Sequence, residues 1–139
     1  MNNILDLILL IFGLPLLLYY LSGWNNLADC YKTNRGTPEI VLKNQSAKLH
    51  KLTCTKILDI GICEEGLYLS VNFYSLNKIV SLLISWNSID EIKYYIDRTY
   101  GKSYEIHLID VKITITLMKE TIETLEERFG RTIITDRSV

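Results

Sequence analysis

Residues 58–73 read LDIGICEEGLYLSVNF, and the spacing of the apolar residues in this stretch decides the fold class. A period of two is typical of a strand with one buried face. Apolar residues recur at every second position on both sides of a Glu-Glu-Gly turn: Leu58, Ile60, Ile62, Leu67, Leu69, Val71 and Phe73. Gly66 in that turn permits the positive φ that a tight reversal needs. The stretch therefore predicts an antiparallel β-hairpin.

The alternation continues downstream and appears more weakly upstream. Further strands are expected over residues 80–86, 92–96, 104–108 and 111–117, and two weaker ones over residues 39–42 and 46–53. Gly101 and Asp110 fall where short turns connect these strands. Short connections join antiparallel neighbours, so we expect an antiparallel sheet.

A helical spacing replaces the alternation after Met118. Ile122, Leu125 and Phe129 recur at the intervals of one helix face, and Gly130 is placed to end the helix. Acidic residues are expected on the outer face of this helix: Glu120, Glu123, Glu126 and Glu127. One amphipathic helix is therefore expected after the last strand.

About seven short strands followed by one helix predict a mainly β domain. We expect a small barrel of antiparallel strands over residues 39–131, with the C-terminal helix covering one open end. Trp86 ends an alternating strand, so it is expected in the core against Leu125 or Phe129. Residues 132–139 are expected to form a tail.

The N-terminal residues 4–21, ILDLILLIFGLPLLLYYL, are apolar except for Asp6. At about 1.5 Å per helical residue this run reaches about 27 Å, close to the hydrocarbon thickness of a bilayer. Three aromatic residues cluster at its far end, where amphipathic rings favour the membrane interface: Tyr19, Tyr20 and Trp24. We predict a transmembrane helix within residues 1–22; an export signal and a buried or interfacial helix are the alternatives.

Charge counting predicts the orientation of this anchor. Residues 22–56 carry six basic and two acidic residues, and almost nothing positive precedes the apolar run. The six basic residues are Lys32, Arg35, Lys43, Lys48, Lys51 and Lys56. Basic flanks stay on the cytoplasmic side, so we expect a single-pass membrane protein whose C-terminal domain faces the cytoplasm. From residue 57 onward acidic residues outnumber basic ones by 13 to 9, which argues against a nucleic-acid partner.

Residues 23–38 are expected to form a short amphipathic helix and a linker. Trp24, Leu27 and Tyr31 recur on one helix face, and Gly36 and Pro38 then mark a loop. The apolar face of this helix could lie on the membrane surface or pack on the domain that follows.

The residue types that carry catalysis or bind metals do not form a familiar pattern. Cys30, Cys54 and Cys63 make no Cys-x-x-Cys pair and no zinc-site spacing. His50 and Cys54 are four residues apart, but the local alternation predicts a strand, where that spacing separates them by about 13 Å. No nucleotide-binding or nucleophile-elbow motif occurs. We therefore expect a non-catalytic protein without a cofactor or metal.

Three segments resemble parts of a known superfold. Residues 66–70, GLYLS, are similar to the Gly-Leu-Tyr entry into an early strand, and residues 84–89, ISWNSI, to an I-x-W-x-x-I segment before a later one. Residues 22–28, SGWNNLA, are similar to a segment of uncharacterised bacterial membrane proteins that carry such a domain. With seven strands and a closing helix, the chain resembles the pleckstrin-homology-like (PH-like) superfold, which includes GRAM and bacterial PH domains. The resemblance implies a fold and a setting near a membrane, and no catalytic residues.

Two functions follow from these expectations. The first is an interaction module at the membrane that offers a protein partner a sheet edge, a groove beside the C-terminal helix, or the acidic surface of residues 120–127. The alternative is a module that senses anionic lipid through the six basic residues after the apolar run. A single basic face beside the anchor would favour lipid binding, and dispersed lysines would favour a protein partner.

Overall fold

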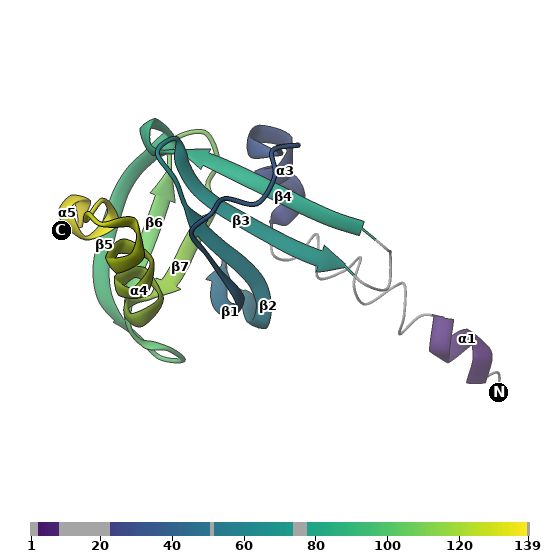
Figure 1. The fold of residues 1–139 in the computed structure, drawn as a ribbon. Helices are drawn as coiled ribbons and strands as arrows, with labels where there is room; N and C mark the ends of the chain where they lie inside the picture. Colours follow the sequence, from purple (N-terminus) through teal and green to yellow (C-terminus); the bar gives the residue numbers. More distant parts are fainter. Residues whose placement is uncertain (1–2, 9–22, 51, 74–77, 139) are drawn as a thin grey trace.

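A curled antiparallel sheet of seven strands forms the body of the protein (Figure 1). The computed structural model describes residues 3–8, 23–50, 52–73 and 78–138. The strands are β1 (Val41–Leu49), β2 (Leu52–Ile62), β3 (Gly66–Phe73), β4 (Lys78–Ser85), β5 (Ile89–Asp97), β6 (Gly101–Leu108) and β7 (Thr114–Met118). Their order across the sheet is β4-β3-β2-β1-β7-β6-β5, so β4 and β5 are the two edge strands. The predicted mainly β, antiparallel class is confirmed.

The C-terminal helix predicted from the sequence is also present. Helix α4 (Lys119–Phe129) packs against β1, β2, β6 and β7, and its Ile122 and Leu125 are fully buried in the core. Gly130 ends the helix in the left-handed conformation, with φ of 89°. The helix therefore covers the inner side of the curled sheet.

The first two strands differ from the expected ones. The sequence indicated strands over residues 39–42 and 46–53, whereas β1 is one strand and β2 begins at Leu52. Asn44 and Lys56 have positive φ values of 56° and 55°, and the β1–β2 register shifts in this region. Such bulges interrupt the alternation of side chains, which hid the true limits of the strands.

The last strand is shorter than expected because residues 111–113 belong to the connection before it. Ile113 is nevertheless only 5% exposed. A Cβ added at Gly23 would lie 2.5 Å from its Cδ1 atom, so this isoleucine packs directly against the chain that precedes helix α3 (Trp24–Tyr31). Ile113 is thus part of the hydrophobic core although it lies outside the strand.

Helix α3 packs on the domain. Of the two alternatives for its apolar face, the membrane surface and the domain, the structure shows the second. Trp24, Leu27, Ala28 and Tyr31 are all buried, and the helix contacts β4. Trp24 is 1% exposed and belongs to the core. The expectation that Trp24 lies at a membrane interface is therefore corrected, because its ring is enclosed by the protein.

The predicted membrane anchor lies mostly outside the described residues. Helix α1 (Asn3–Ile8) covers its beginning, whereas residues 9–22, including Tyr19 and Tyr20, are not described. Among the residues that are described, no helix has both the length and the apolar character needed to cross a membrane.

The C-terminal residues are not a loose tail. The short helix α5 (Ile134–Arg137) places Ile134 in the core, where it is fully buried. Glu126, expected on the outer face of α4, is only 4% exposed, and its carboxylate accepts hydrogen bonds from the amides of Ile133, Ile134 and Thr135. A carboxylate at a helix N-terminus satisfies amides that have no partner within that helix. The packed body therefore extends beyond residue 131.

Candidate interaction surface

The outer side of β4 is covered by the segment that follows α3. The Thr33 amide donates a hydrogen bond to the Ser81 carbonyl over 3.0 Å, and Lys32 forms an antiparallel bridge with Leu82. Helix α3 packs against the same strand. This edge of the sheet is thus covered near its centre by the chain itself.

Within the described part of the chain, the outer side of β5 carries one backbone bridge, and the short helix α5 packs against the same strand. Ser138 forms a parallel bridge with Ile92, and no other described residue bridges this side of the strand. Residues 93–97 have no backbone partner on this side among the described residues, and we call this open stretch the β5 edge. An open edge offers a row of backbone donors and acceptors to another strand.

Two large apolar side chains are exposed on the β5 edge. Ile96 is 67% exposed and Tyr94 is 39% exposed, whereas Ile92 on the same face is buried in the core. The Tyr94 ring lies 5.4 Å from the ring of Tyr104, between centroids, and the Nζ atom of Lys119 lies 5.9 Å from its centroid. The apolar face of the sheet thus continues past the cover that the helices provide.

A groove of about 300 Å³ lies next to these side chains, between the β5–β6 hairpin and the start of α4. Its lining residues are Tyr100, Lys102, Met118, Lys119, Glu120 and Glu123. Lys102 is the cross-strand partner of Ile96, so the groove and the β5 edge adjoin. Together they form a partly apolar surface bordered by charges of both signs.

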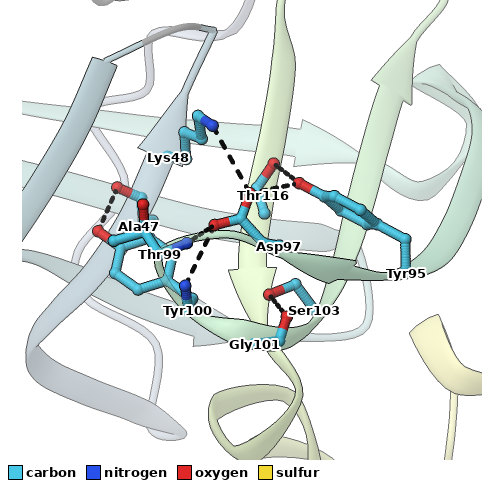
Figure 2. A network of polar contacts seen from close by, with 9 residues as sticks. All are labelled: Ala47, Lys48, Tyr95, Asp97, Thr99, Tyr100, Gly101, Ser103 and Thr116. Atoms are coloured by element: carbon cyan, nitrogen blue, oxygen red, sulfur yellow. Dashed lines mark hydrogen bonds and ion pairs between the residues drawn. The ribbon is translucent and has the colours of Figure 1, made fainter.

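The turn that ends the β5 edge is fixed by the carboxylate of Asp97 (Figure 2). Its Oδ2 atom accepts hydrogen bonds from the amides of Thr99 (2.9 Å) and Tyr100 (3.1 Å), and its Oδ1 atom accepts one from the Tyr95 hydroxyl (2.9 Å). The Lys48 Nζ atom lies 3.5 Å from Oδ1. Burial alone would raise the pKa of Asp97, but the amide and hydroxyl hydrogen bonds and Lys48 outweigh it and hold that pKa below its ordinary value.

A second set of contacts ties the hairpin to the rest of the sheet. The Tyr100 hydroxyl lies 3.4 Å from the carbonyl oxygens of both Ala47 and Cys54, on β1 and β2. The Tyr95 hydroxyl also lies 3.4 Å from the Thr116 Oγ1 atom on β7. These hydrogen bonds tie the hairpin that carries the β5 edge to β1, β2 and β7.

Five of the six basic residues proposed for lipid contact are described, and they lie on several different elements. Arg35 forms an ion pair with Glu65 (2.9 Å), and Lys48 pairs with the buried Asp97. The three other described members are exposed on different elements: Lys32 after α3, Lys43 on β1 and Lys56 on β2. Lys51 lies outside the described residues. The described members are dispersed, and two of them are bound to carboxylates.

The residues expected in the core occupy buried or half-buried positions. Trp86 is 8% exposed, Leu125 is fully buried, and Phe129 is partly buried against the core. The Trp86 indole donates a hydrogen bond to the Cys63 carbonyl (3.1 Å), and the Trp86 carbonyl accepts one from Arg137 (2.7 Å). The polar contacts of this tryptophan thus come from the β2–β3 turn, which the sequence predicted, and from α5, which it did not.

The described residues hold no cluster of three or more histidine, cysteine or acidic side chains that could bind a metal ion. Burial raises the pKa of the Cys54 thiol to about 11, so this thiol is protonated at neutral pH and is a poor nucleophile. His50 lies in the turn after β1, while Cys54 lies within β2. This pair therefore lacks the features of an activated nucleophile and its base.

No family model, no curated protein and no solved structure matches this chain.

Proposed function

We propose that this protein is a non-catalytic, PH-like interaction module, held at a membrane by its N-terminal apolar segment, that binds a protein partner along the β5 edge. Seven antiparallel strands followed by helix α4 support the PH-like assignment. The observation that carries the binding proposal is the open strand of residues 93–97, on which Ile96 is 67% exposed. An extended segment can join such an edge through main-chain hydrogen bonds, while exposed side chains select its sequence.

The membrane setting rests on the apolar run of residues 4–21 and on its attachment to the domain. Trp24 is buried three positions after the end of this run, and Gly23 lies against Ile113. Such a short connection would hold the domain close to the bilayer. The basic residues after the run favour a cytoplasmic position for the domain. A reporter that is active only outside the cytoplasm, fused after Val139, should stay inactive; strong activity would overturn this orientation.

The open β5 edge can be tested with two matched surface variants of the full chain. Ile96→Lys places a charge on the β5 edge, and Ile57→Lys places the same charge at a half-exposed isoleucine on β2. We expect Ile96→Lys to lose at least tenfold of the protein captured from detergent extracts, and Ile57→Lys to retain it. Equal capture by both variants would overturn the proposal that the β5 edge is the binding surface.

Lipid sensing by the basic residues is the second candidate function. The dispersal of these residues, and the pairing of Arg35 and Lys48 with carboxylates, favour the protein partner instead. A chain beginning at Ser22 should bind vesicles of anionic lipid weakly, with no preference among headgroups, and less as salt increases. Tight and headgroup-selective binding at high salt, lost when Lys43, Lys48, Lys51 and Lys56 are changed to Gln, would favour the lipid function.

A further inference from the structure

The length of the β5 edge is fixed at both ends by the fold. The bridge between Ser138 and Ile92 covers the strand at one end, and β5 stops at Asp97, where the turn begins. Five residues, 93–97, remain between these limits, and Tyr95 is their midpoint. A partner strand that covers the whole edge therefore also spans five residues.

Two copies of this five-residue segment have complementary side chains when they pair in antiparallel orientation. A two-fold axis at Tyr95 sets Tyr94 of one copy opposite Ile96 of the other, and the reverse pair follows by symmetry. Both side chains lie on one face of the strand, and both are exposed in the single chain. Cross-strand pairs of an aromatic and a β-branched residue stabilise antiparallel sheets. We infer that the partner that fits the β5 edge is a second copy of this chain, paired through residues 93–97 about Tyr95. This inference rests on the proposed use of the β5 edge for protein binding.

The other face of the strand carries Lys93, whose side chain is 53% exposed and lies opposite Asp97 of the second copy. Asp97 is only 5% exposed and its carboxylate is already bound by Lys48 and by two backbone amides of the turn, so it is not available as a partner for Lys93. A lysine on an edge strand deters pairing with unrelated strands. The attraction between the two copies therefore comes from Tyr94 and Ile96.

Neighbouring symmetric registers fit less well. An axis at Tyr94 would pair Ile96 with Ile92, whose outer side is already covered by Ser138. An axis at Ile96 would set Tyr94 opposite Arg98, which lies in the turn beyond the strand. Only the axis at Tyr95 uses every residue of the open edge.

The contact is small, which sets the expected strength of association. A five-residue ladder buries less than the roughly 800 Å² per partner of a standard stable interface. Association in dilute detergent should therefore be weak and depend on concentration. Confinement of both copies to one membrane raises their effective concentration and favours the pair.

Cysteine cross-linking of the full chain in membranes tests the register. The background is Cys30→Ser, because Cys30 is the exposed cysteine of the described three. Facing residues of an antiparallel pair have Cα atoms about 4.5–5.5 Å apart, within reach of a disulfide. Tyr95→Cys should therefore form a disulfide-linked dimer on mild oxidation, whereas Lys93→Cys should not, since its Cα atoms would be roughly 14 Å apart. Adding Ile96→Lys to Tyr95→Cys should abolish the link.

A second cross-link avoids removal of the Tyr95 hydroxyl, which contacts Asp97. Tyr94→Cys co-expressed with Ile96→Cys should give a mixed dimer, and either variant alone should give little, because its own Cα atoms would be roughly 8 Å apart. Equal linking of all variants, or none at any position, would overturn the dimer. If no link forms while Ile96→Lys still loses captured protein, the second copy is excluded and the β5 edge remains a site for another protein. If Ile96→Lys also has no effect on capture, the proposed function fails as well.

Discussion

The two edge strands of the sheet differ in how far other segments of the chain cover them. On β4, the N-terminal segment adds a helix with four buried residues, a backbone hydrogen bond at Ser81 and a bridge at Leu82. On β5, the described C-terminal segment adds one bridge, at Ile92, and the packing of the short helix α5. The covered edge belongs to the core of the fold, whereas the open edge carries exposed apolar side chains on the β5–β6 hairpin. Substitutions on the β4 side should therefore change stability, and substitutions on the β5 edge should change association.

The largest expected effect is at Trp24, which is 1% exposed on the helix that covers β4. Trp24→Ala should lower the free energy of unfolding by about 3–5 kcal/mol, as large-to-small changes in a core do. Asn26→Ala, at an exposed position of the same helix, is the control and should change it by less than about 0.5 kcal/mol. Equal unfolding midpoints in denaturant would show that α3 is not part of the cooperative fold.

A smaller loss is expected at Glu126, which holds the segment that reaches β5. Its buried carboxylate accepts hydrogen bonds from three backbone amides at the start of α5, and Glu126→Gln removes the charge. Hydrogen bonds to charged groups contribute about 1.5–3 kcal/mol each, and we expect a total loss of about 2–3 kcal/mol. Glu127→Gln, at an exposed position, should be neutral. Similar stabilities for the two variants would contradict the role of this carboxylate.

Asp97 should give the hairpin a dependence on pH. Its pKa is below the ordinary value, so the ionised form stabilises the folded state above about pH 4, and this stabilisation is lost as the pH falls through the lowered pKa. Asp97→Asn should lower the free energy of unfolding at pH 7 by about 1–3 kcal/mol. It should also flatten the decline in stability between pH 5 and pH 2. Parallel curves for the variant and the original chain would show that this carboxylate is not the titrating group.

The smallest effect on stability is expected at the β5 edge itself. Ile96 is 67% exposed, so Ile96→Lys should change the free energy of unfolding by no more than about 0.5 kcal/mol. Association should nevertheless be lost, because a charge replaces the apolar group that faces the partner strand. A large loss of stability at this position would mean that Ile96 belongs to the core, and the contrast between the two edges would fail.

The sequence predicted the strands well where one face is buried and the turn is tight. The β2–β3 hairpin follows from the alternation in residues 58–73, and α4 follows from the spacing of Ile122, Leu125 and Phe129. The limits of β1 and β2 could not be predicted, because positive φ values at Asn44 and Lys56 break the alternation. Helix α5 was missed because four residues carry too short a pattern to distinguish a helix from a tail.

The sequence predicted that a sheet edge could serve as an interaction surface, but not which edge. The alternation placed Ile96 in the same row as the buried Ile92, and nothing in that pattern distinguishes a covered row from an open one. That distinction depends on where α4 and Ser138 lie against the sheet, which is a matter of three-dimensional packing. For Trp24 the sequence suggested exposure at a membrane interface, whereas the residue is buried. An aromatic residue after an apolar run is equally compatible with a membrane interface and with a core.

Amide hydrogen exchange of the full chain in detergent, measured at low and high protein concentration, tests the contrast between the edges most directly. The Thr33 amide, bonded to the Ser81 carbonyl, should be protected at both concentrations. The outward-facing amides of residues 93–97 should exchange rapidly at low concentration and become protected at high concentration, as pairing covers the β5 edge. Protection of residues 93–97 already at low concentration, or no change with concentration while Thr33 exchanges freely, would contradict a covered β4 edge and an open, pairing β5 edge.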